Sequence, residues 1–149
     1  MLTRTLNDLF KRELEKLKTE IESYRSERTI WIIDKNISNS GGNLCLHLMG
    51  NLNHFIGKEL GNTDYVRNRD LEFSQKDVPK AELVQKIEDT ISVLNSTFSK
   101  LSDEHLSGEY PTLVFKEKTS TQFFLLHLLS HLSYHLGQIN YHRRLLDSE

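Results

Sequence analysis

The sequence has 149 residues, of which 37% are hydrophobic and 27% are charged, and its formal net charge is -2. That length fits one domain built around one hydrophobic core. The near-neutral charge excludes a strongly basic nucleic-acid surface, and it gives no reason to expect an anionic membrane as a partner. We therefore predict a single domain over residues 1–149, with neither nucleic acid nor membrane as a partner.

The composition also indicates a compartment. No apolar run approaches the roughly 18 residues that a membrane-spanning helix needs. The first residues mix acidic and basic side chains, which is not the pattern of a secretory signal. Cys45 is the single cysteine, so no internal disulfide can form. Together these features predict a cytoplasmic protein.

Four segments carry the three- and four-residue spacing of apolar side chains that is typical of amphipathic helices. The first covers residues 2–24, where leucines fall on one side of the helix and charged residues on the other. The second covers residues 40–60 and can be capped by a residue between Ser38 and Ser40. The third covers residues 79–101, with Pro79 suited to the first helical position. The fourth covers residues 119–147. The pattern predicts an all-α fold, a four-helix bundle with long connections.

The connections between these segments are longer than the usual link between neighbouring helices. Their length permits crossovers within a bundle and allows them to cover one end of it. Trp31 lies in the first connection, and Tyr110 and Phe115 lie in the third. We expect these aromatic side chains to wall a small-molecule pocket, since such pockets are mostly apolar.

The fourth helix carries an unusual row of polar side chains. With about 100° per residue, His127, His131, His135, Gln138 and His142 share one side of this otherwise apolar helix. Histidines four residues apart can direct ring nitrogens at one ion. The spacing predicts a metal-binding pair, but it does not decide between His127 with His131 and His131 with His135. Ordinary core histidines, bonded to backbone or water, are the alternative.

Two histidines do not make a tight metal site, so a third ligand must come from another element. His47 on the second helix can supply it, and Asn51 lies one turn further on the same face. The alternative is that His47 faces solvent together with its polar neighbours. We expect His54, His105 and His142 to be surface residues. Cys45 points away from His47 and is expected to be a small buried apolar residue.

Two motifs resemble the DinB / YfiT-like superfamily of metalloenzymes. They are Asn-Leu-Cys-Leu-His-Leu-Met-Gly-Asn over residues 43–51 and His-Leu-Ser-Tyr-His-Leu-Gly-Gln over residues 131–138. The resemblance spans nearly the whole chain and implies a four-helix bundle. It further implies that His47, His131 and His135 bind a divalent ion, nickel or zinc, with positions left open for water. This choice favours His135 over His127.

Relatives of known activity in that superfamily include transferases that use low-molecular-weight thiols. The resemblance therefore implies a metal-dependent transferase that joins a small-molecule thiol to an electrophilic substrate. Three neutral imidazoles suit this chemistry, because they leave metal positions free and because a coordinated thiol loses its proton. Gln138 and Asn51 are placed to orient a ligand or a bound water. The alternatives are a metal-dependent hydrolase of a small molecule and a non-catalytic metal-binding or stress-related module.

A second stripe on the fourth helix concerns assembly. Its spacing of four, three and four residues is that of a helix-packing surface. One reading is that helices of the same chain cover it, and the other is that it pairs two chains in a homodimer. We expect the homodimer. The stripe consists of Leu125, Leu129, Leu132 and Leu136.

Overall fold

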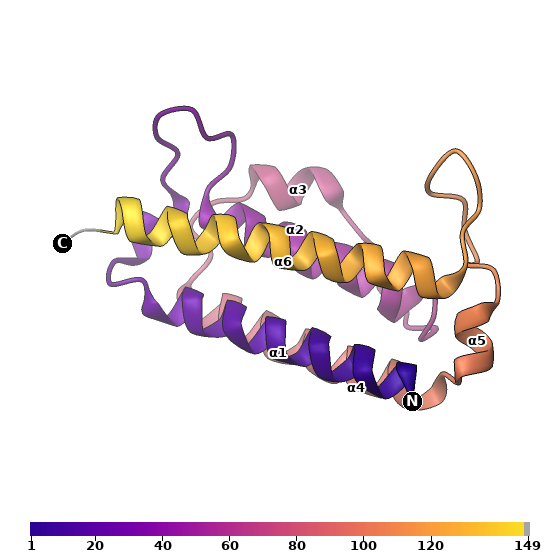
Figure 1. Ribbon diagram of the computed structural model, residues 1–149. Coiled ribbons are helices and arrows are strands. Elements are labelled where there is room, and N and C mark those ends of the chain that lie inside the picture. The colour runs from indigo at the N-terminus through magenta and orange to yellow at the C-terminus, as the bar shows by residue number, and fades with distance from the viewer. Residues whose placement is uncertain (148–149) are drawn as a thin grey trace.

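A computed structural model describes residues 1–147 and shows an all-helical chain over that range (Figure 1). The six α-helices are joined by one 3-10 turn, η1, and one π-helical turn, η2. No strand forms in the described residues; an isolated bridge pairs Glu109 with Ser120. The elements in order are α1 (Leu2–Ser23), η1 (Glu27–Trp31), α2 (Gly41–Leu52), η2 (Asn53–Lys58), α3 (Arg69–Ser74), α4 (Lys80–Lys100), α5 (Asp103–Ser107) and α6 (Thr121–Leu146).

Three of the helices expected from the sequence, α1, α4 and α6, form close to their predicted bounds. The second, predicted over residues 40–60, is α-helical only from Gly41 to Leu52 and continues as the π-helical turn η2 to Lys58. Ser40 caps α2 by accepting a hydrogen bond from the Asn43 backbone N–H, and Ser120 caps α6 in the same way through Phe123. Pro79 is the residue before α4 rather than its first residue. The short helices α3 and α5 and the turn η1 lie in the connections, where no apolar periodicity predicted them.

The four longer segments pack side by side, with α1 against α4 and α6, and α2 against α4 and α6. Asn7 near the start of α1 bonds Asn95 near the end of α4, so these two helices are antiparallel. Glu20 near the end of α1 pairs with Arg143 near the end of α6, so α1 and α6 run parallel. The helices α2 and α4 follow one another in the chain and also run parallel, so the segment between them, which includes α3, must return from one end of the molecule to the other, as Figure 1 shows.

The helix α2 is the most enclosed element, because all 12 of its residues are buried. It packs against α4 and α6, and the short helix α3 and turn η1 cover its remaining sides. Gly42 lets the Trp31 ring lie against the α2 backbone, since a Cβ at that position would overlap the ring. A polar side chain on α2 is therefore held inside the protein and must find its partners there.

The leucine stripe of α6 packs inside the chain. Leu125 and Leu132 are fully buried in the core, Leu136 is 9% exposed, and Leu129 packs partly against the same core. The apolar side chains that α6 exposes lie elsewhere on the helix, so a homodimer would need a different surface. The homodimer remains a prediction, and sedimentation of the protein at micromolar concentration would check it. None of the helices described is long and apolar enough to cross a membrane.

His142 is buried near the end of α6, so its predicted surface position is wrong. The Tyr24 hydroxyl lies 2.7 Å from His142 Nδ1, and His142 Nε2 lies 2.8 Å from the Ile32 carbonyl oxygen. The carbonyl can only accept, so Nε2 donates to it and Nδ1 accepts from the hydroxyl. His142 therefore joins α6 to the chain on both sides of η1, which explains why a helical wheel of α6 alone misplaces it.

This buried histidine predicts a pH dependence of stability. Burial lowers the pKa of His142, while the hydrogen bond to Ile32 opposes that shift. The unfolded chain takes up a proton near pH 6.5 and the folded chain resists it. The free energy of unfolding should thus fall as the pH decreases below 6.5. His142→Gln should weaken this decrease in denaturant titrations at pH 7.5 and pH 5.5. An unchanged pH dependence in that variant would contradict the assignment.

Candidate metal centre

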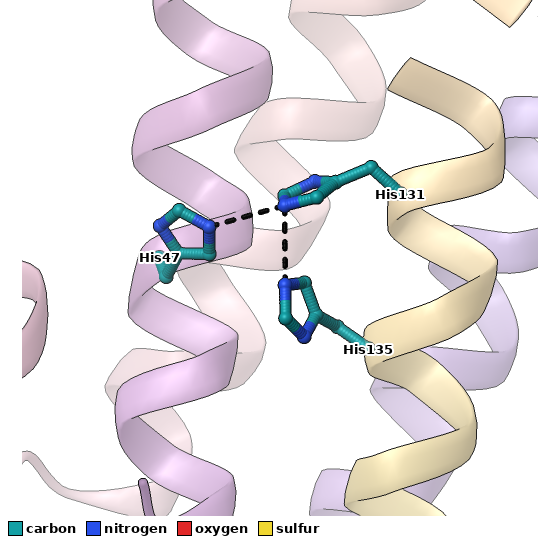
Figure 2. A group of neighbouring side chains, drawn as sticks. All are labelled: His47, His131 and His135. Carbon is teal, nitrogen blue, oxygen red and sulfur yellow. Dashed lines mark hydrogen bonds between the residues drawn. The ribbon is translucent and has the colours of Figure 1, made fainter. Parts of the chain in front are cut away.

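Three histidines from two helices meet between α2 and α6 (Figure 2). His131 and His135 lie one turn apart on α6, and His47 faces them from α2. His131 Nε2 lies 3.2 Å from His47 Nε2 and 3.1 Å from His135 Nε2. One ring nitrogen of each residue lies within 4.8 Å of the others, so the three histidines are close enough to hold one metal ion.

Hydrogen bonds at the opposite ring nitrogens select the tautomer of two members. His47 Nδ1 lies 3.1 Å from the Glu72 carboxylate, and His135 Nδ1 lies 2.7 Å from the Gln138 side-chain oxygen. Both oxygens accept, so Nδ1 carries the proton in each ring and Nε2 presents its lone pair to the centre. Gln138 thus contacts the His135 ring on the side away from the centre.

His131 completes a set of donors suited to a cation. Its Nδ1 is buried and makes no hydrogen bond to the described residues. If Nε2 carried the ring proton, that one proton would have to serve the lone pairs of both His47 and His135. A divalent ion at the centre would accept all three lone pairs at once. Nitrogens about 2.0 to 2.1 Å from an ion are separated by about 3.3 Å in tetrahedral and about 2.9 Å in octahedral geometry, and the two observed separations lie between these values.

The electrostatics favour the neutral imidazoles that metal binding requires. Burial, together with the neighbouring His135 and His47 rings, lowers the pKa of His131 to about 4. Burial also lowers the pKa of His135, although its bond with Gln138 opposes the shift. Both shifts favour the neutral form of the ring, which keeps one nitrogen lone pair available for an ion.

A carboxylate and a guanidinium support the centre from behind His47. Glu72 lies on α3, is 6% exposed, and pairs with both Arg67 and His47. Arg67 Nε and one terminal nitrogen lie 2.8 and 3.0 Å from the two Glu72 oxygens, which is a bidentate arrangement. Burial acts to raise the pKa of Glu72, but the hydrogen bonds from His47 and Arg67 outweigh it and lower the pKa. Glu72 is therefore ionised and fixes the His47 ring.

Sequence patterns did not reveal this pair. Glu72 lies 25 residues from His47 in a connection without apolar periodicity, and only the folding of α3 onto α2 brings the two together. Gly50 shows how close that approach is, because a Cβ on it would overlap the Glu72 carboxylate. The available signal was local: Asn68 caps α3 by accepting from the Leu71 N–H, a pattern that places Glu72 in the first turns of a helix.

The remaining candidates lie outside the three-histidine group. His127 is exposed, and its ring centre lies 6.5 Å from that of His131. His105 is exposed as expected, and His54 is partly buried beside Glu59. Cys45 is fully buried, and burial raises its pKa to about 12, which agrees with an inert apolar role.

Two expectations for polar and aromatic side chains are corrected. The solvent-facing alternative for His47 is excluded, since its exposure is 6%. Its neighbour Asn51 is also buried, and its side-chain oxygen has no partner among residues 1–147. Trp31 and Tyr110 pack in the core instead of lining an open pocket. Trp31 lies against α2, and Tyr110 stacks on Phe124 and donates to the Phe55 carbonyl.

The fold and this site define an all-helical protein with a three-histidine group that could hold a metal ion. The chain belongs to the protein family of unknown function DUF1572, whose model matches residues 3–149. Comparison with curated proteins found no match.

Replacing the supporting carboxylate should weaken metal binding. In Glu72→Gln the uncharged amide no longer pairs with Arg67 and is a poorer acceptor for the His47 N–H. Loss of such a partner typically lowers metal affinity about 10- to 100-fold. Glu59→Gln is the matched control, because Glu59 pairs with His54 outside the group. Competition with a chelator measures both affinities. Equal affinities for the two variants would contradict the role of Glu72.

Proposed function

We propose that the protein is a DinB-like metalloprotein in which His47, His131 and His135 bind one divalent ion, nickel or zinc. The observation that carries this proposal is the convergence of three Nε2 atoms, with that of His131 lying 3.2 Å from His47 and 3.1 Å from His135. Two of these atoms present lone pairs that their Nδ1 hydrogen bonds enforce. We also infer that α1, α2, α4 and α6 constitute a four-helix bundle of that superfamily's type.

The activity that we propose is a metal-dependent transfer of a low-molecular-weight thiol to a small electrophile. When bound, the divalent ion would supply a positive charge that favours the thiolate, which is the nucleophile in such reactions. The chain's own contribution is to fix the imidazoles. Glu72 orients His47 and Gln138 orients His135, while α2 and α6 keep the two sides of the site apart.

The donor set favours this activity over the two alternatives. A purely structural ion is usually held by four protein ligands, and the group found among the described residues has three members. A hydrolase needs a base that can take a proton from water. Glu72 is the nearest buried carboxylate, but its oxygens are engaged by Arg67 and His47 on the side of the His47 ring that faces away from the centre.

The test is a thiol-conjugation assay on untagged protein loaded with nickel or zinc. We expect conjugation of a small thiol to a halogenated aromatic or an epoxide, with a rate that requires both the ion and the thiol. Removing the ion with a chelator should abolish turnover while the helical circular dichroism persists. Hydrolysis of an ester or amide without any thiol would instead establish the hydrolase alternative. Metal binding without either turnover would establish the non-catalytic one.

A further inference from the structure

A cavity of about 540 Å³ opens beside the three-histidine group. It lies between the loop of residues 33–39 and the C-terminal half of α6, and His135 and Gln138 form part of its wall. The volume is within the range of small-molecule sites, about 300 to 1,000 Å³. His135 therefore belongs both to the group that could hold an ion and to a cavity large enough for an organic molecule.

The solvent-exposed part of the cavity wall is apolar. Ile37, Tyr134, Tyr141 and Leu145 line it, and their exposures range from 42% to 68%. Large apolar side chains grouped at the surface are typical of a binding site, because each leaves hydrophobic area in contact with water. A ligand body that covers them would gain the free energy of that burial.

The charges at the cavity indicate which ligands fit. Among the described lining residues, the charged side chains are Asp34 and Lys35, one of each sign and adjacent in the chain. His142 also lines the cavity, but both of its ring nitrogens are engaged by Tyr24 and Ile32. No cluster of cations faces the space, so the wall does not suit a polyanion such as a nucleotide.

The loop is anchored at both ends and lightly bonded between them. At one end the Ile32 carbonyl accepts from His142, and at the other Ser40 caps α2. Between these anchors the loop makes local hydrogen bonds, from the Lys35 N–H to the Asp34 carboxylate and from the Ile37 N–H to the Asp34 carbonyl. Ile37 can thus adjust to a ligand while the cavity keeps its place beside His135.

From this arrangement we propose that the cavity binds the aromatic or branched alkyl body of an uncharged or singly charged substrate, whose polar end is directed past His135 to the metal centre. The role of the polar end rests on the proposed function. The apolar nature of the ligand body is inferred from Ile37, Tyr141 and Leu145, and this part of the inference does not depend on the proposed function.

The first experiment uses protein loaded with Co²⁺ and follows the thiolate-to-cobalt absorption band. We expect 2-phenylethanethiol to bind about tenfold or more tightly than 2-mercaptoethanol, since its ring gains burial at the same thiolate. Ile37→Asp and Leu145→Asp should each remove most of that preference, measured as the ratio of the two affinities. Leu113→Asp is the matched control, because Leu113 is 59% exposed on the connection between α5 and α6, outside the cavity wall.

A second measurement needs no metal. Metal-free protein with labelled isoleucine and leucine methyl groups is titrated with 2-phenylethanol, and saturable shifts are expected at Ile37 and Leu145 but not at Leu113. No shift at Ile37 and Leu145 would overturn the proposal, as would equal affinity of cobalt-loaded protein for the two thiols. Failure of the metal site itself is distinguishable, because it would appear as protein that binds no cobalt while the methyl shifts remain.

Discussion

Protein purified without an affinity tag should carry about one divalent ion per chain, and His131→Ala should lose it. His131 is the central member of the group, with Nε2 contacts to both His47 and His135. Without the His131 ring, His47 on α2 and His135 on α6 are the two remaining donors, and the nitrogen that contacts both of them is lost. Elemental analysis of gel-filtered protein measures the metal content directly, and we expect a fall from about one ion to nearly none.

The matched control for that variant is His127→Ala. His127 lies one turn before His131 on the same helix and is exposed, so its removal should leave the metal content unchanged. His54→Ala should also retain the ion. Full metal content in His131→Ala would contradict the assignment. Loss of the ion in His127→Ala would restore the alternative pair that helical spacing alone leaves open.

The second large effect is expected at Gly50, where Gly50→Ala should weaken metal binding and destabilise the fold. A Cβ at this position would overlap the Glu72 carboxylate, so α3 or the Glu72 side chain must move away from His47. We expect the affinity for the ion to fall about 10- to 100-fold, as for loss of an orienting partner, and the free energy of unfolding to fall by about 1 to 3 kcal/mol from overpacking.

Gly137→Ala is the control for Gly50→Ala, and we expect it to stabilise the fold instead of destabilising it. Gly137 also lies inside a helix, but a Cβ there would meet nothing within 4 Å. Alanine is favoured over glycine in a helix by about 0.5 to 1 kcal/mol, so this variant should be slightly more stable and bind metal normally. Chelator competition and chemical denaturation measure both variants. Stabilisation by Gly50→Ala would show that Glu72 does not approach α2 as described.

Much of the fold follows from apolar periodicity. The spacing of leucines and isoleucines placed α1, α4 and α6 within a few residues of their bounds, because each of these helices has one buried and one solvated face. On α2 the same reasoning located the helix but left the environment of His47 open. That helix is buried on every side, so polar residues on it do not mark a solvent-facing surface.

The parts that the sequence did not predict depend on contacts between distant segments. Glu72 and Arg67 reach His47 only because α3 folds across α2. The burial of His142 depends on Tyr24 and on the Ile32 carbonyl, which belong to the other end of the chain. A helical wheel describes one element at a time and therefore cannot represent either relation. The spacing of His131 and His135 was informative because both residues lie on one helix.

The complete enclosure of α2 has a consequence for hydrogen exchange. Amide hydrogens in the most enclosed element exchange only when the whole domain opens, whereas those in exposed segments exchange through small local openings. The amides around His47 should therefore be among the slowest of the chain, and those of residues 33–39 among the fastest. The site would then have a fixed wall at α2 and a movable one beside His135, so a small molecule would enter and leave on the side of the loop.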